Sequence, residues 1–267
     1  MARRIVPRRI GPRRLQPEEE ATLVEHLTEL RQRLVVVLLA IVPAFAVAYV
    51  FHEELISRLM DLLPEGTPLV TLGVTEPFTT SLKVSFYVAL ALILPLLLWQ
   101  VWSFFAPAVG ADTQRVISVL VVFATFLFAA GVTFCYTIVL PRALEFLVDY
   151  DSELYLEQIR ASYFLSFVTL TLFAFGLSFQ MPIFILGLVR LGALSSSRLR
   201  KNRRIGYVAM LSFAILLPTV DPVSLVLEVV PLFILFELSI WLSVWMERRW
   251  ERAALEQEDW DDEDALT

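Results

Sequence analysis

The feature that most constrains this chain is a series of long apolar runs separated by short charged segments. Six runs stand out, at about 34–51, 79–104, 115–140, 163–189, 205–219 and 223–246. Roughly 20 apolar residues in a helix cross a bilayer, so the pattern predicts an all-α membrane protein with six transmembrane helices. The fifth run is short and would need tilted neighbours or a locally thinned bilayer. The tight turn at Asp221 and Pro222 predicts a hairpin between the last two runs.

The distribution of lysine and arginine sets the expected orientation of these helices. Residues 1–33 hold eight of the 22 basic residues, residues 190–204 hold six, and residues 248–252 hold three. Arg115 lies on the same side, whereas only four basic residues fall on the other side. Cytoplasmic loops carry the excess of positive charge, so both termini are predicted to be cytoplasmic.

The two ends of the chain differ in composition from the expected membrane domain at 22–250. Residues 1–21 repeat paired arginines with a proline every fifth residue, which predicts a disordered basic tail. Anionic lipid is its expected partner, with another acidic partner as the alternative. Residues 251–267 are acidic and predict a second disordered tail. The loops at 52–78 and 141–162 have helical apolar spacing, which predicts short amphipathic helices at the outer interface.

A charged segment, 22–34, comes immediately before the first apolar run. Thr22 and Glu25 have the spacing of a capping box, so a helix can start there. Glu29 then lies about 7 Å before the apolar run along that helix, at the membrane surface. Two readings are open for Glu29: it binds a cationic ligand, or it pairs with Arg33 one turn on, which contributes only about 0.3–0.5 kcal/mol.

Few polar residues interrupt the apolar runs. Gln180, near the middle of the fourth run, and Pro182 are expected to interrupt that run. Glu237 lies in the sixth run between its centre and the cytoplasmic side. Polar groups in lipid need partners, so each predicts either a hydrogen bond inside the protein or a contact with another subunit. Glu228 lies close to the outer end, where it can face water.

The same residues argue against enzymatic chemistry. His26 and His52 flank the first run and should lie on opposite sides of the membrane, so no metal site is expected. The single Cys135 is expected to pack as a small hydrophobe. No phosphate-binding loop or catalytic set occurs, so neither a cofactor nor a nucleic-acid partner is expected. A small-solute transporter or channel subunit is the alternative function, although its usual matched halves are not evident.

Several segments together resemble one family. His26–Leu34 is similar to the HLxELRxRL signature of TatC, the receptor subunit of the twin-arginine protein translocase. Further similar segments, within a resemblance that covers about 22–246, are Glu76–Phe78, Pro95, Gln100–Phe104, Ala106–Ala108, Ala174–Pro182, Leu199–Arg204, Pro218, Asp221, Pro231 and Phe236–Glu237.

The resemblance implies a six-helix, cup-shaped bundle in the cell (inner) membrane, with cytoplasmic termini. It also implies a non-enzymatic function, the recognition of twin-arginine signal peptides at the cytoplasmic face. Family members work with the single-span subunits TatA and TatB, as homo-oligomers in a receptor complex. They export folded proteins by using the proton-motive force.

Individual residues take expected roles from this resemblance. Glu29 would receive the arginine pair, because carboxylates bind guanidinium groups strongly at a partly desolvated interface. The usual acid of the first cytoplasmic loop corresponds to Thr113, so neighbouring Asp112 is the expected helper. The remaining expected residues are Arg31, Phe104 and Arg115 around the signal peptide, and Gln180, Asp221 and Glu237 toward partner helices. Some members have Glu at the position of Gln180, and the amide here removes any proton-carrying role.

Overall fold

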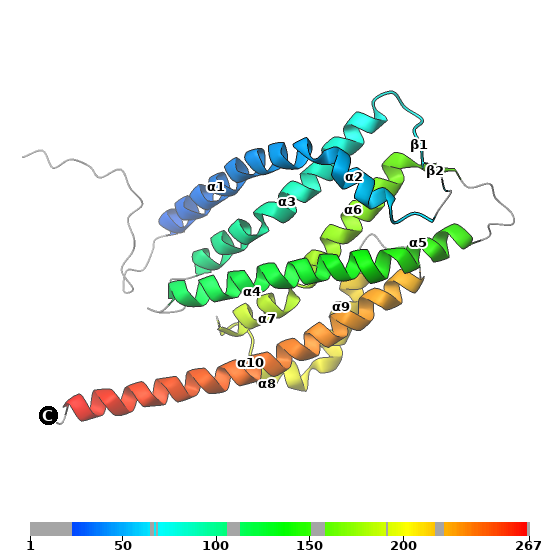
Figure 1. Cartoon of the computed structure of the whole chain (residues 1–267). Coiled ribbons are helices and arrows are strands. Elements are labelled where there is room, and N and C mark those ends of the chain that lie inside the picture. Colours follow the sequence, from blue (N-terminus) through cyan, green and yellow to red (C-terminus); the bar gives the residue numbers. More distant parts are fainter. Residues whose placement is uncertain are drawn as a thin grey trace, which may run out of the picture.

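The computed structural model describes residues 23–64, 67, 69–105, 113–150, 158–190, 192–216 and 222–265. These residues are almost entirely helical (Figure 1). The elements are α1 (Leu23–Val50), α2 (His52–Met60), β1 (Leu69–Val70), α3 (Glu76–Phe105), α4 (Thr113–Phe134), the π-helical turn η2 (Cys135–Val139), α5 (Leu140–Asp149), β2 (Ile159–Arg160), α6 (Ala161–Ser178), α7 (Met181–Arg190), α8 (Ser196–Lys201), α9 (Arg203–Ile215) and α10 (Pro222–Ala265).

Within the described residues, five helical stretches are long and apolar enough to cross a membrane: Leu27–Val50, Glu76–Phe104, Ser118–Asp149, Ala161–Arg190 and Pro222–Arg248. The expected all-α membrane fold is therefore confirmed. The fifth expected span corresponds to α9, which has 13 residues and is about 20 Å long, shorter than the hydrocarbon core of about 30 Å. Residues 217–219, the rest of that expected span, lie outside the described residues.

The long helices pack in a consecutive series. Helix α1 lies against α3, α3 contacts both α4 and α6, and α10 packs on α7 and α9. Figure 1 shows the start of α1, the end of α3 and the start of α4 at the same end of the molecule, where α10 also ends. We call this end the Glu29 end, and the opposite end, which carries α2, the α2 end.

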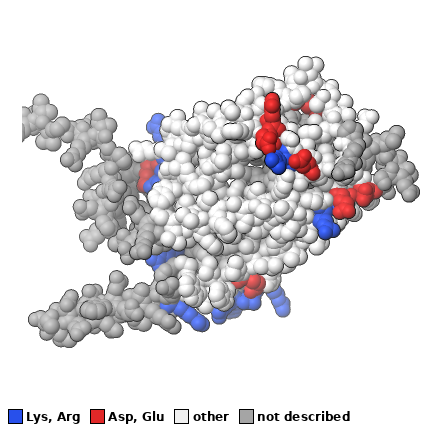
Figure 2. Space-filling model, in the orientation of Figure 1, with Lys and Arg blue, Asp and Glu red and all other residues white. Residues whose placement is uncertain are grey.

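Charged side chains are grouped in a few places on the molecule. Figure 2 shows a broad uncharged surface with charged groups along its left, lower and right margins and a further cluster of acidic and basic groups on the upper part of the face. Many large apolar side chains of the long helices are exposed, including Leu39 on α1 and Phe126 on α4. An apolar exterior between two charged ends is the arrangement that a multi-pass membrane protein requires, because lipid tails contact the band between its ends.

Two expectations about helix ends are corrected. The third span was predicted to close at Pro141, but the helix continues to Asp149 through η2 and α5. The Leu140 amide already bonds to the Cys135 carbonyl, five residues back, so the hydrogen-bond frame has shifted just before the proline. The acidic segment 251–267 was predicted to be disordered, but α10 runs to Ala265. Its alanine, leucine and glutamate content favours helix continuation.

Other expectations about local structure are confirmed. The break expected at Gln180 and Pro182 is present, because α6 ends at Ser178 and α7 begins at Met181. The loop after the first apolar run forms the amphipathic helix α2, and α5 provides the helix expected in the loop after the third run.

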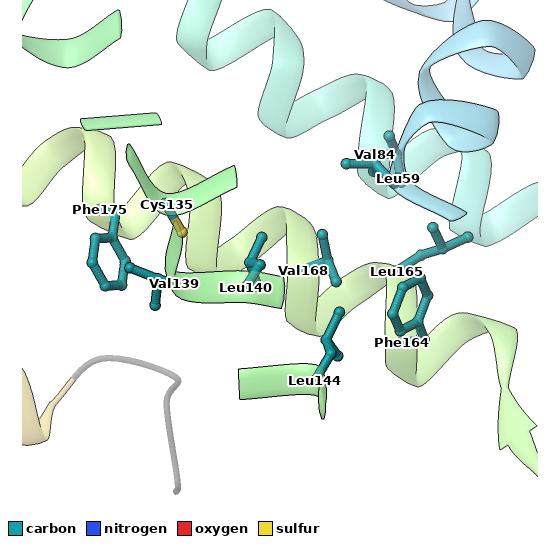
Figure 3. Packing of buried hydrophobic residues seen from close by; sticks show 10 residues of the cluster. All are labelled: Leu59, Val84, Cys135, Val139, Leu140, Leu144, Phe164, Leu165, Val168 and Phe175. Atoms are coloured by element: carbon teal, nitrogen blue, oxygen red, sulfur yellow. The ribbon is translucent and has the colours of Figure 1, made fainter. Parts of the chain in front are cut away.

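The largest buried apolar cluster joins α2, α3, η2, α5 and α6. Figure 3 shows its residues: Leu59, Val84, Cys135, Val139, Leu140, Leu144, Phe164, Leu165, Val168 and Phe175. Cys135 is fully buried there, so it packs as the expected small hydrophobe. This cluster fixes α2 and α5 onto the membrane-spanning helices.

A second close contact lies where α7 crosses α3. A Cβ atom on Gly187 would lie 1.7 Å from the Trp102 ring, so glycine is required for this approach. Trp102 itself is 9% exposed and packs into the protein. The contact holds the last turns of α3, which precede the segment 106–112, against α7.

Candidate functional site

The candidate site lies at the start of α1, around Glu29. Helix α1 begins at Leu23 and continues through the apolar run, so Glu29 occupies its second turn. The Glu29 side chain is 30% exposed. The proposed capping partner Thr22 lies outside the described residues. The sequence thus places a partly exposed carboxylate at the polar end of a membrane-spanning helix.

Glu29 pairs with Arg33, one turn further along α1. Glu29 Oε1 accepts hydrogen bonds from Arg33 Nη2 at 2.5 Å and from Arg33 Nε at 3.1 Å. The internal ion pair was one of the two readings of Glu29, and the structure contains it. Both donors converge on a single oxygen. Among the described residues, Arg33 uses only this oxygen of the carboxylate, and the Oε2 atom takes no part in the pair.

Arg33 also reaches across to the last turns of α3. Its Nη1 donates to Gln100 Oε1 at 3.0 Å and to the Gln100 carbonyl at 3.5 Å, while Nη2 donates to the Ser103 carbonyl at 3.1 Å. The last four carbonyls of a helix, among them that of Ser103 in α3, lack intrahelical donors. A guanidinium satisfies such a carbonyl and is favoured at the negative end of the helix dipole. One side chain therefore links the candidate carboxylate to the end of α3.

Of the other expected signal-peptide residues, only Arg31 and Phe104 have described side chains. Arg31 is exposed on α1, and Phe104 is half-buried in the last turn of α3. Thr113 and Arg115 lie in the first turn of α4, and their side chains are outside the described residues, as is all of Asp112. Because α3 and α4 pack together, these segments share the Glu29 end (Figure 1).

The residues expected to contact partner helices have contacts inside the chain. Gln180 is fully buried, and its Nε2 donates to the Ala124 carbonyl on α4 at 2.9 Å. Glu237 on α10 accepts a hydrogen bond from the Tyr207 hydroxyl and lies 3.4 Å from Arg203 Nη1, so it binds α9 to α10. Asp221 lies outside the described residues. The internal readings of Gln180 and Glu237 thus have direct structural support.

Sequence reasoning missed three features of the charged and buried groups. It did not predict the contacts of Arg33 with α3, whose partners lie 67 and 70 residues away. It also missed the pairing of Glu76 with Arg160 at the α2 end. Glu228, which was expected to be able to face water, is 1% exposed, because α10 packs against η2 and α5 there. The signal that could have predicted the burial of Glu228 is its position inside an apolar run.

Comparisons with known proteins agree with this geometry. The family described as "Sec-independent protein translocase protein (TatC)" matches residues 25–231. The TatC protein of Escherichia coli K12 is 34% identical over 230 residues, covering 85% of this chain and 89% of that protein. The TatC protein of Deinococcus radiodurans is 32% identical, covering 84% of this chain and 86% of that protein.

Solved structures are similar over most of the chain. The crystal structure of the twin arginine translocase receptor TatC in DDM has a TM-score of 0.74 and 31% sequence identity. The matched region covers 82% of this chain and 99% of the chain in that crystal structure. A second crystal structure of the same receptor has a TM-score of 0.70.

The apolar helices, the charged ends and these matches define a multi-pass membrane component of a protein translocase, which is not an enzyme. The chain belongs to the TatC family, the Sec-independent, twin-arginine translocase proteins. Membership of this family replaces the alternative function considered for the sequence, a small-solute transporter or channel subunit.

Proposed function

We propose that this protein binds twin-arginine signal peptides at the cytoplasmic face of the cell membrane, with the Glu29 end on that face. Together with TatA- and TatB-type single-span subunits, it exports folded proteins by using the proton-motive force. In this proposal it works as a homo-oligomer in the receptor complex. The name of the similar solved structures, a twin arginine translocase receptor, supports the assignment.

One observation carries the receptor role: Glu29 at the polar end of α1 is a partly exposed carboxylate that pairs with Arg33 through only one of its two oxygens. Guanidinium groups bind carboxylates with strong, directional, charge-assisted hydrogen bonds. The site adjoins the end of α3, from which the first cytoplasmic loop leaves. Asp112 in that loop is the proposed second carboxylate, and Arg31, Phe104, Thr113 and Arg115 surround the peptide.

The orientation rests on the distribution of basic residues. Cytoplasmic segments carry the excess of lysine and arginine, and most of the 22 basic residues belong to the amino-terminal segment, the 190–204 segment and the carboxy-terminal segment. The start of α1 and the end of α10 lie at the same end of the molecule (Figure 1). This arrangement supports a common side for both termini.

Contacts with single-span partners are proposed on the α9 and α10 side. Asp221 and Glu237 are the proposed polar contacts, and Ile205, Val208 and Trp241 are among the exposed apolar residues nearby. Gln180 would act there only indirectly, because its side chain is buried within the chain. Such polar contacts stabilise the association of a partner helix in lipid when that helix carries a hydrogen-bonding group of its own.

Photocrosslinking tests the receptor role. The full chain in membranes is offered a peptide with Arg-Arg before an apolar segment, and a matched peptide with Lys-Lys. We expect strong crosslinking of the Arg-Arg peptide at the Glu29 end, because ammonium groups cannot reproduce the planar guanidinium contact. Equal crosslinking of the two peptides would contradict receptor function.

A further inference from the structure

Arg33 makes contacts that an ordinary surface ion pair does not make. Its side chain is 22% exposed, and its guanidinium donates to two acceptors on α3 as well as to Glu29. The Nε–Nη2 edge bonds to Glu29 Oε1, and the Nη1 group bonds to Gln100. Because the guanidinium is planar and rigid, these contacts fix the position of Glu29 relative to α3.

The pairing leaves the second carboxylate oxygen of Glu29 available. Both Arg33 donors use Oε1, so the Oε2 atom can accept from another guanidinium without displacing Arg33. Displacing Arg33 from Glu29 and from α3 would cost free energy, because the carbonyls of Gln100 and Ser103 would then lose their hydrogen bonds to its guanidinium. The geometry thus favours a carboxylate that is shared by an internal and an external arginine.

We propose that Arg33 is a positioning residue for recognition of the arginine pair. It holds the Glu29 carboxylate against the end of α3 so that Oε2 faces the incoming peptide guanidinium. It also keeps the start of α1 and the root of the first cytoplasmic loop in register, so that both sides of the binding site stay aligned. This inference rests on the proposed function, because it assigns Arg33 a role in that same site.

If Arg33 were a competitor of the peptide, its removal would change peptide affinity in the opposite direction. If Arg33 competed with the peptide for Glu29, removing its guanidinium would strengthen peptide binding. If it positions Glu29, removal weakens binding. Arg33→Lys keeps the positive charge but loses the fork, because an ammonium is a single point of donation and cannot span Glu29 and the α3 carbonyls together. This variant therefore separates geometry from charge.

The test is a double-mutant cycle on the purified full chain in lipid nanodiscs. The probe is a fluorescent peptide with Arg-Arg before an apolar segment, and Kd is measured for wild type, Arg33→Lys, Glu29→Gln and the double variant. We expect Arg33→Lys to weaken binding about tenfold and to lower the preference for Arg-Arg over Lys-Lys. In the Glu29→Gln background, Arg33→Lys should change Kd less than about twofold, since its effect passes through Glu29.

A second variant and a matched control guard against a simple loss of folding. Gln100→Ala removes one α3 acceptor and leaves Glu29 and all charges intact, so it should weaken binding only when Glu29 is present. Glu54 and Arg58 on α2 form an ion pair with the same four-residue spacing at the opposite end of the molecule. Glu54 Oε1 lies 3.0 Å from Arg58 Nε. Arg58→Lys should leave Kd unchanged.

The outcomes separate the two proposals. Loss of binding in Glu29→Gln with no change in Arg33→Lys and Gln100→Ala would overturn the positioning role alone. Tighter binding in Arg33→Lys, or an equal loss from Arg33→Lys with and without Glu29, would also overturn it. Unchanged binding in Glu29→Gln would overturn the receptor site at Glu29, and the role of Arg33 with it.

Discussion

Glu76 Oε1 lies 2.9 Å from Arg160 Nε, joining the start of α3 to the strand before α6 across 84 residues of sequence. The same oxygen accepts from the Ser162 amide at 3.2 Å, and Oε2 accepts from the amides of Leu72 and Gly73. The bond to Glu76 raises the pKa of Arg160. Beside this cluster, β1 pairs in parallel with β2. One carboxylate therefore joins the segment before α3 to the segment before α6 at the α2 end.

Glu76→Gln is expected to lower the thermal stability of the protein. An amide loses the ion pair with Arg160 and half of its acceptor capacity, which leaves backbone amides without their partners. Thermal unfolding of the purified protein measures the change in Tm. Glu54→Gln is the matched control, because its pair with Arg58 is exposed and contributes little. Equal Tm values for the two variants would show that the Glu76 cluster is not a stabilising contact.

Gly187→Ala is expected to destabilise the contact between α3 and α7. The added Cβ would lie 1.7 Å from the Trp102 ring, so the ring or helix must move. Overpacking of this kind costs about 1–3 kcal/mol, and it should appear as a lower denaturation midpoint. Gly73→Ala is the control, because the nearest atom to its Cβ would be 3.8 Å away. A similar midpoint for both variants would mean that Trp102 readily adopts another position.

Much of the fold could be predicted from the sequence, because membrane helices are dictated locally. An apolar stretch must satisfy its own backbone hydrogen bonds in lipid, so long runs become helices whatever their neighbours. This reasoning predicted α1, α3, α6 with α7, and α10, and the break near Gln180. It failed at Pro141, because the π-helical turn that accommodates the proline is not encoded in apolar periodicity.

The candidate site could be predicted only in part, because its geometry depends on contacts between distant residues. The sequence placed Glu29 on a helix at the polar end of a span and offered Arg33 as a neighbour. It could not show that Arg33 also reaches Gln100 and Ser103, because helix pairing is not written in either segment alone. The buried position of Glu228 depends on helix packing in the same way.

Glu29→Ala is expected to reduce export of a twin-arginine reporter protein about tenfold or more, with normal amounts of the variant in the membrane. The substitution removes a charge-assisted contact to the peptide arginine, and such contacts are worth about 1.5–3 kcal/mol. Reporter activity outside the membrane, normalised to the amount of this protein, measures the effect. Glu54→Ala serves as the control. Unchanged export would mean that Glu29 is only a helix-surface residue paired with Arg33.

Asp112→Asn is expected to weaken binding of an Arg-Arg peptide more than Thr113→Ala does. Thr113 occupies the position at which the resemblance predicts an acid, but only Asp112 supplies a negative charge in this loop. A partly exposed charge pair contributes up to about 1 kcal/mol, so Asp112→Asn should raise Kd about fivefold. The effect should shrink as salt rises, because exposed charges are screened. The reverse order of the two variants would assign the second contact to the threonine hydroxyl, and would leave Glu29 as the sole carboxylate of the proposed site.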